Sequence, residues 1–366
     1  MGESLEAYYI PVSLSDLEAI QDIIQQHEIF CAPVPGVDLY KCLTWRREGA
    51  HYGTEVHALF DRNILSDVLQ LAHSALGQSE ACGERGRIGA ALMAFLQCSN
   101  ITIEPNMALY ENAPRANAEL SLFRRADEVD PTIYTDIALD RMNSMPPDAL
   151  PPLDKPIPQV NFSMAIKGRR NLRIATLKIA EIELLDLPAV QKMERFLRWS
   201  FSDFCFLAGP VLLAAAYFTP RREGSVLKNL RSADRQKALA AVSNAVWDLQ
   251  MIYHWAKRAG RQREENSFWL FCSRDRALKQ IARAFLCSAD ESSEVELGLQ
   301  EFFETTWGTR DGAHLAELMR SLEREQHSPD RMVNAGASND YPDQLAAQIE
   351  SSFLSWRPSK SAVSQT

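Results

Sequence analysis

The sequence predicts an α/β protein in which a parallel sheet is flanked by helices. Three short apolar segments lead to this prediction, because each has the length of a strand and is bounded by residues that break strands. They are 55–61, 100–105 and 268–273. Helical periodicity follows each of them, and strands that alternate with helices favour right-handed crossovers and parallel pairing. Side chains that follow these strands are therefore expected at the carboxyl edge of the sheet, where such proteins place their working sites.

The composition is that of a globular protein. The chain has 366 residues, of which 46% are hydrophobic and 24% charged, which is enough for about two domains. The net charge of −9 excludes a generic basic nucleic-acid coat protein, but it is compatible with a cluster of metal-binding carboxylates. Seven scattered cysteines form no C-x-x-C pair, so neither a disulfide framework nor a structural zinc site is predicted. No phosphate-binding loop or serine nucleophile elbow is present.

The first half of the predicted core begins after an N-terminal extension, 1–54, which holds a helix at 13–29. The strand EVHALFD is followed by RNILSDVLQLAHSAL, whose apolar residues form one helical face. A second helix is predicted at 87–97, and the β-branched segment NITIEP is stopped by Pro105. The core therefore runs from residue 55 to the helix that starts with NMALYENA and contains Glu111.

The middle of the chain has a different character, and 112–232 is predicted to be a mainly helical insertion. Six prolines make 146–158 a stiff, extended linker. The basic stretch KGRRNLRIATLK (167–178) is interpreted either as a track for a nucleic-acid backbone or as a solvated helix face. The apolar segment 199–219 is nearly long enough to span a membrane, but Asp203 and an internal proline interrupt it, which favours a buried core helix over membrane association.

The second half of the core is predicted at 233–287, followed by an acidic extension, 288–366. It consists of a long helix at 233–259, the strand FWLFCS and the amphipathic helix DRALKQIARAFL. The N-terminal sequence MGESLEAYYIPVS has neither a basic region nor an apolar core of the kind that secretory signals need, so a cytoplasmic protein is expected.

Four acids occupy suggestive positions. Asp61 closes the first strand, Glu111 follows the second, and Asp275 follows the third in the sequence Ser-Arg-Asp. Asp248 lies among apolar neighbours in a helix. A buried, unpaired carboxylate costs several kcal/mol, whereas carboxylates that share Mg²⁺ or Mn²⁺ avoid that cost. Two simpler interpretations remain: Asp275 caps the following helix, and Glu111 is a solvated helix residue.

These pieces resemble the PIN-domain nucleases, which occur as toxins of bacterial toxin–antitoxin pairs and in eukaryotic RNA decay. The four pieces are LFDRNIL, ITIEPNMALYEN, NAVWDLQMIYHWAK and WLFCSRDRALKQIA. The resemblance covers roughly 55–111 and 235–287 and implies a PIN-like fold. It also implies that Asp61, Glu111, Asp248 and Asp275 are the catalytic, metal-binding acids, supported by Asn63 and Ser273.

The implied activity is metal-dependent endonucleolytic hydrolysis, with Mg²⁺ or Mn²⁺ polarising the phosphate and activating a water. The resemblance favours RNA over DNA as substrate, and a bacterial toxin or antiviral defence effector as the setting. The insertion would then gate the site or bind a regulatory protein. The alternative is a PIN-like interaction module without catalysis. Five basic residues are candidates for phosphate contacts: Arg62, Arg274, Lys257, Arg258 and Arg261. Arg62 has a second interpretation, in which it caps a carboxylate.

Overall fold

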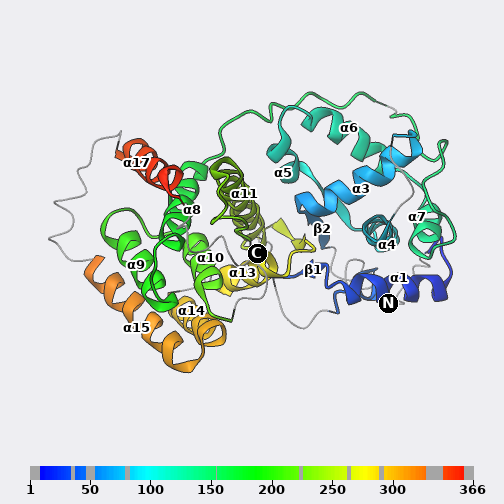
Figure 1. Cartoon of the computed structure of the whole chain (residues 1–366). Coiled ribbons are helices and arrows are strands. Elements are labelled where there is room, and N and C mark those ends of the chain that lie inside the picture. Colours follow the sequence, from blue (N-terminus) through cyan, green and yellow to red (C-terminus); the bar gives the residue numbers. More distant parts are fainter. Residues whose placement is uncertain are drawn as a thin grey trace, which may run out of the picture. The chain divides into compact units, whose positions relative to one another are not determined.

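The computed structural model describes most of the chain (Figure 1). The described residues are 9–33, 38–46, 54–78, 83–153, 155–221, 226–261, 265–287, 292–326 and 341–357. Parts of the predicted terminal extensions lie outside these ranges, including the acidic residues Asp290 and Glu291. Two compact units divide the chain: unit 1 comprises Met1–Met164 and Lys257–Arg274, and unit 2 comprises Ala165–Ala256 and Asp275–Thr366.

Unit 1 contains a four-stranded sheet in the order β1-β4-β2-β3. Its strands are β1 (Phe30–Cys31), β2 (Glu55–Phe60), β3 (Thr102–Glu104) and β4 (Ser267–Cys272). β2 pairs in parallel with both β3 and β4, whereas β1 pairs antiparallel with β4 at one edge. The α/β prediction and its three strands are confirmed. β1 adds a strand that the sequence analysis missed, because two residues are too few to show alternation.

The register of β2 and β4 determines which residues meet at the carboxyl edge. Phe60, the last residue of β2, pairs with Cys272, the last residue of β4, and both are fully buried. Asp61 and Ser273 therefore leave the sheet side by side. The backbone N–H of Asp61 donates to the carbonyl of Cys272 at 3.0 Å, which extends the parallel ladder by one bond.

Six helices of unit 1 precede, separate or follow the first three strands along the chain, and the helices predicted at 13–29, after EVHALFD and at 87–97 are among them. They are α1 (Leu14–Gln26), α3 (Arg62–Ala75), α4 (Glu84–Cys98), α5 (Asn106–Leu109), α6 (Ala116–Asp127) and α7 (Pro131–Ala138). α4 packs against α1, α3 and α7 and buries residues on nearly all of its surface. The segment that holds Glu111 is a 3₁₀ turn, Tyr110–Asn112, rather than the longer helix that the sequence suggests. Unit 1 also includes 112–164, which the sequence division assigns to the insertion.

Among its described residues, unit 2 contains helices and connecting turns but no strand. Its helices are α8 (Arg169–Glu183), α9 (Ala189–Ser202), α10 (Ala208–Phe218), α11 (Arg235–Ala259), α13 (Arg276–Cys287), α14 (Ser292–Trp307), α15 (Thr309–Gln326) and α17 (Tyr341–Ser355). The last three residues of α11 belong to unit 1. The amphipathic α17 packs against α8 within unit 2.

The prediction of one buried helix over 199–219 is wrong in its continuity. The structure ends α9 at Ser202 with Asp203 as the C-cap, and α10 begins only at Ala208. Pro210 lies in the first turn of α10, where the missing N–H breaks no helical bond. α10 itself is almost entirely buried, as the prediction of a core helix requires. Among the described residues, no helix combines the length and the apolar character needed to cross a bilayer.

Candidate functional site

Asp61 is held rigidly at the point where β2 ends and α3 begins. Its side chain is buried, with the residue only 4% exposed, and it caps α3 by accepting a hydrogen bond from the Arg62 backbone N–H at 2.6 Å. The other carboxylate oxygen accepts hydrogen bonds from Ser273 Oγ, at 2.7 Å, and from Asn63 Nδ2. These three bonds fix the orientation of the Asp61 carboxylate.

Asn63 and Ser273 lie directly against Asp61. Asn63 Nδ2 is also 3.2 Å from Ser273 Oγ, and Asn63 Oδ1 accepts the backbone N–H of Arg274 at 3.2 Å. The backbone N–H of Ser273 donates to the carbonyl of Ile29, next to β1. Asn63 therefore ties the first turn of α3 to the end of β4, and both supporting residues act on the orientation of Asp61.

Glu111 is electrostatically coupled to Asp61. Burial raises the pKa of the Glu111 carboxyl group, and the nearby negative charge of Asp61 raises it further. Arg62 opposes this rise, and Glu119 adds to it. Two acids from different elements of unit 1 therefore share one region of negative potential, where a cation would favour the ionised form of both.

Arg62 is engaged by an acid of its own. Its guanidinium donates to the two carboxylate oxygens of Glu119 at 2.6 and 3.0 Å, a bidentate pair. Asn112 Nδ2 donates to the same carboxylate at 2.8 Å. Burial alone would raise the pKa of Glu119, but the hydrogen bonds from Arg62 and Asn112 and the nearby positive charge lower it overall. Arg62 thus caps a carboxylate, as its second interpretation proposes, and the carboxylate is that of Glu119.

Arg274 forms an ion pair with Asp67 of α3, in which only its Nη2 donates a hydrogen bond. Its Nε lies 2.8 Å from one carboxylate oxygen and its Nη2 lies 3.2 Å from the other. Burial raises the pKa of Asp67 to about 6, although the positive charges of Arg274 and Arg85 act in the opposite direction. Sequence reasoning identified neither Glu119 nor Asp67 as a partner. Each acid lies far from its arginine along the chain, and no sequence pattern distinguishes it from the many other acids as the partner.

The basic residues near the end of α11 are partly neutralised. Arg258 and Arg261 lie 3.9 and 3.8 Å from carboxylate oxygens of Glu265, and the Arg258 guanidinium lies 5.3 Å from the centre of the Trp269 ring. Lys257 is exposed on the last turn of α11. These contacts hold Arg258 against β4, whereas Lys257 and Arg261 are both exposed.

Asp248 and Asp275 belong to unit 2, whereas Asp61 and Glu111 belong to unit 1. Asp275 precedes α13 and accepts the backbone N–H of Leu278 at 3.1 Å, which is the capping role that its position suggests. Asp248 is half-buried on α11. Within the described ranges, no three His, Cys, Asp or Glu side chains are grouped closely enough to hold a metal ion. A site shared by all four acids therefore stays a prediction.

The pair Asp61 and Glu111 nevertheless fits a hard divalent cation in its chemistry. Both offer carboxylate oxygens, and Mg²⁺ is often held in proteins by one or two carboxylates together with waters and substrate phosphates. The coupling between the two acids is the observation that supports this fit.

Three arginines of the basic stretch at 167–178 contact other helices of unit 2. The Arg169 guanidinium lies 3.9 Å from the centre of the Trp247 ring, and Arg170 and Arg173 pair with Asp343 and Glu350 of α17. Arg170 and Arg173 thus link α8 to α17, whereas Arg169 stacks on Trp247 of α11. The nucleic-acid track stays a prediction.

Comparison with protein-family models finds no matching family, and comparisons with curated proteins and with solved structures find no matching relative.

Proposed function

We propose that the protein is a metal-dependent endonuclease whose site is built around Asp61 and Glu111. The observation that carries the proposal is the position of the buried Asp61 at the carboxyl end of a parallel strand, where its negative charge raises the pKa of the half-buried Glu111. The site is supported by Asn63 and Ser273, which orient Asp61. RNA as the substrate, and completion of the site by Asp248 and Asp275, rest on the PIN-like resemblance and belong to the same proposal.

Each residue of the proposed site has a separate role. Asp61 and Glu111 would hold Mg²⁺ or Mn²⁺, which when bound polarises the scissile phosphate and lowers the pKa of a water. Asn63 and Ser273 keep the Asp61 carboxylate in one rotamer, so that little reorganisation is needed when substrate binds. The exposed Lys257 would attract the phosphate backbone. A role as a toxin or antiviral effector, restrained by a regulatory protein, is the biological setting that we propose.

A non-catalytic interaction module is the second candidate, and two specific observations favour it. First, Arg62 is paired with Glu119 and Arg274 is paired with Asp67, so the charges of both arginines are neutralised. Second, Asp275 caps α13. A module would need these ion pairs for stability and would need no bound cation.

Cleavage of labelled single-stranded RNA separates the two candidates. The assay uses the full chain with Mg²⁺, with Mn²⁺ and with EDTA, beside Asp61→Asn, Glu111→Gln and the control Asp148→Asn, which changes an exposed acid of unit 1. We expect the wild-type chain to cleave RNA only with a metal ion. The cleavage rate should fall by at least about a hundredfold in the first two variants and stay unchanged in the control. Absence of cleavage, together with absence of Mn²⁺ binding by calorimetry, would favour the module.

A further inference from the structure

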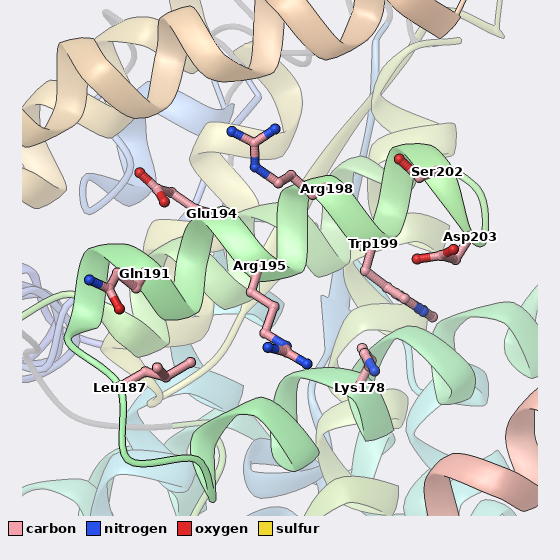
Figure 2. Close-up of a pocket in the computed structure, with 9 residues that line it drawn as sticks. All are labelled: Lys178, Leu187, Gln191, Glu194, Arg195, Arg198, Trp199, Ser202 and Asp203. Atoms are coloured by element: carbon pink, nitrogen blue, oxygen red, sulfur yellow. The ribbon is translucent and has the colours of Figure 1, made fainter.

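Unit 2 contains a pocket of about 570 Å³ beside α9 (Figure 2). Its lining includes three cationic side chains, unlike the acidic site of unit 1. Its walls come from α8, α9 and the turn that follows each of them. Figure 2 shows Arg195 and Trp199 leaving α9 on the side where Lys178 of α8 lies, whereas Glu194 and Arg198 leave it on the opposite side. A smaller pocket of about 190 Å³ shares Lys178 and Arg195 with the first. These two cations therefore stand at the junction of two hollows.

Arg195 is the charge that distinguishes this pocket. It is exposed, and among the described residues it has no ion-pair partner. Two other charges of the lining are paired: Lys178 Nζ lies 2.7 Å from a carboxylate oxygen of Glu181, and Glu194 contacts His314 at 2.5 Å. Arg198 and Asp203 have no ion pair among the described residues either, but Arg198 leaves α9 on the side opposite Arg195 (Figure 2). A guanidinium presents a planar fork of donors that matches phosphate or carboxylate oxygens, so Arg195 is suited to an anionic ligand.

The wall beside Arg195 is aromatic and rigid. Trp199 lies one turn further along α9, is 7% exposed, and stacks on Phe204 with ring centres 5.2 Å apart and planes inclined by 18°. Lys178 Nζ lies 5.5 Å from the centre of the same ring. Leu187 adds an apolar side chain, and the exposed Asp203 supplies an acceptor beyond Trp199. The pocket thus joins a cationic end, an apolar wall and an acidic end.

We propose that this pocket binds a phosphate ester of nucleotide size. Arg195 and Lys178 would receive the phosphate, Trp199 and Leu187 would contact the apolar part of the ligand, and Asp203 would accept a hydrogen bond from a hydroxyl or amino group. The volume lies in the range of small-molecule sites, about 300–1,000 Å³. A free nucleotide and the 5′-phosphorylated end of an RNA chain present the same chemistry. The proposal concerns unit 2 alone and does not depend on the activity proposed for Asp61 and Glu111.

Calorimetry and amide NMR on the full chain test this binding with four probes: AMP, adenosine, inorganic phosphate and a 5′-phosphorylated RNA tetramer. We expect saturable binding of AMP or of the tetramer, with adenosine and inorganic phosphate at least tenfold weaker. The tighter of the first two probes identifies the source of the phosphate. The tests repeat with Arg195→Gln, with Lys178→Gln and with Arg310→Gln, a control that removes an exposed arginine from α15 of the same unit.

The substitution pattern decides the outcome. Binding reduced at least tenfold in Arg195→Gln, with Lys178→Gln affected in the same direction and Arg310→Gln unchanged, supports the proposal. Equal affinity in Arg195→Gln and Arg310→Gln overturns it, as does the absence of binding by all four probes to the wild-type chain. Because Arg195 and Arg310 are both exposed, neither substitution removes a buried contact that folding requires.

Discussion

Ser273 Oγ donates a hydrogen bond to Asp61 Oδ2 at 2.7 Å, and this bond joins residues 212 positions apart in the sequence. It forms because Phe60 and Cys272 pair at the ends of β2 and β4, which brings the next residues of the two strands together. The hydroxyl of Ser273 is buried and has Asn63 as a second neighbour. The bond therefore links the ends of β2 and β4 and orients the Asp61 side chain.

Removal of this hydroxyl is expected to destabilise unit 1. Ser273→Ala deletes one donor to a buried carboxylate, and a hydrogen bond to a charged group contributes about 1.5–3 kcal/mol. We expect the free energy of unfolding in urea to fall by about that amount. The control Ser355→Ala removes an exposed hydroxyl that donates to Ser352 within α17, and it should change stability by less than about 0.5 kcal/mol. Equal effects of the two variants would show that the Ser273 bond contributes nothing special.

The strands at this edge are the part of the fold that the sequence predicted best. β2, β3 and β4 are short, apolar and bounded by polar residues or proline, so their positions follow from composition alone. Once they pair in parallel, Asp61, Asn63 and Ser273 must gather at one edge, and the structure places them there. β1 escaped notice because its two residues show no period.

Other features depended on contacts that no local pattern encodes. The partners of Arg62 and Arg274 lie 57 and 207 positions away, and many acids of the chain were equally plausible choices. The break between α9 and α10 falls within an apolar run, where periodicity cannot separate one helix from two. Asp275 fits both a strand end and a helix cap, and the hydrogen bond to Leu278 shows only the second role.

The pair of the buried Asp67 and the half-buried Arg274 predicts a pH dependence of stability. Because the folded state raises the pKa of Asp67 from 3.8 to about 6, the folded state binds this proton more tightly than the unfolded chain. Asp67 therefore contributes stability when it is protonated, and this contribution is lost as the pH rises from about 4 to about 6. Two pKa units correspond to up to about 3 kcal/mol, an order-of-magnitude figure.

Asp67→Asn removes this titration. The difference in unfolding free energy, variant minus wild type, should rise between pH 4 and 6 and stay constant above about pH 7. Urea unfolding at intervals of half a pH unit measures it, with Asp148→Asn as a control that should give a flat difference. A flat difference for Asp67→Asn as well would show that its pKa is not raised in the folded protein.

The coupling of Glu111 to Asp61 can be measured directly. Asp61→Asn removes a negative charge near Glu111, so the pKa of the Glu111 carboxyl group should fall in this variant. Arg62→Gln removes a positive charge and should move the same pKa upward. Carboxyl ¹³C chemical shifts of Glu111 followed against pH report both changes. Opposite or absent shifts would mean that the two acids do not share a site, and the case for a cation between them would lose its support.

Arg235 is expected to be the most sensitive position for the attachment of α17. It is 7% exposed, and its Nη1 donates to the carbonyls of Leu230 and Ser232 at 2.6 and 2.9 Å. Its Nε and Nη2 donate to the carbonyl of Phe353, near the end of α17, at 3.3 and 3.0 Å. The guanidinium also lies 4.2 Å from the centre of the Phe353 ring. One planar group thus joins the start of α11 to α17.

Lysine cannot reproduce this arrangement, because a single ammonium lacks the planar fork and stacks poorly on an aromatic ring. Arg235→Lys should therefore lower the unfolding free energy of unit 2 by about 2–4 kcal/mol and increase hydrogen exchange in α17. Arg170→Lys is the matched control, since its exposed pair with Asp343 has a distance of 3.4 Å and should contribute less than about 1 kcal/mol. If Arg235→Lys and Arg170→Lys loosened α17 equally, general charge attraction, rather than the fork of Arg235, would hold the helix in place.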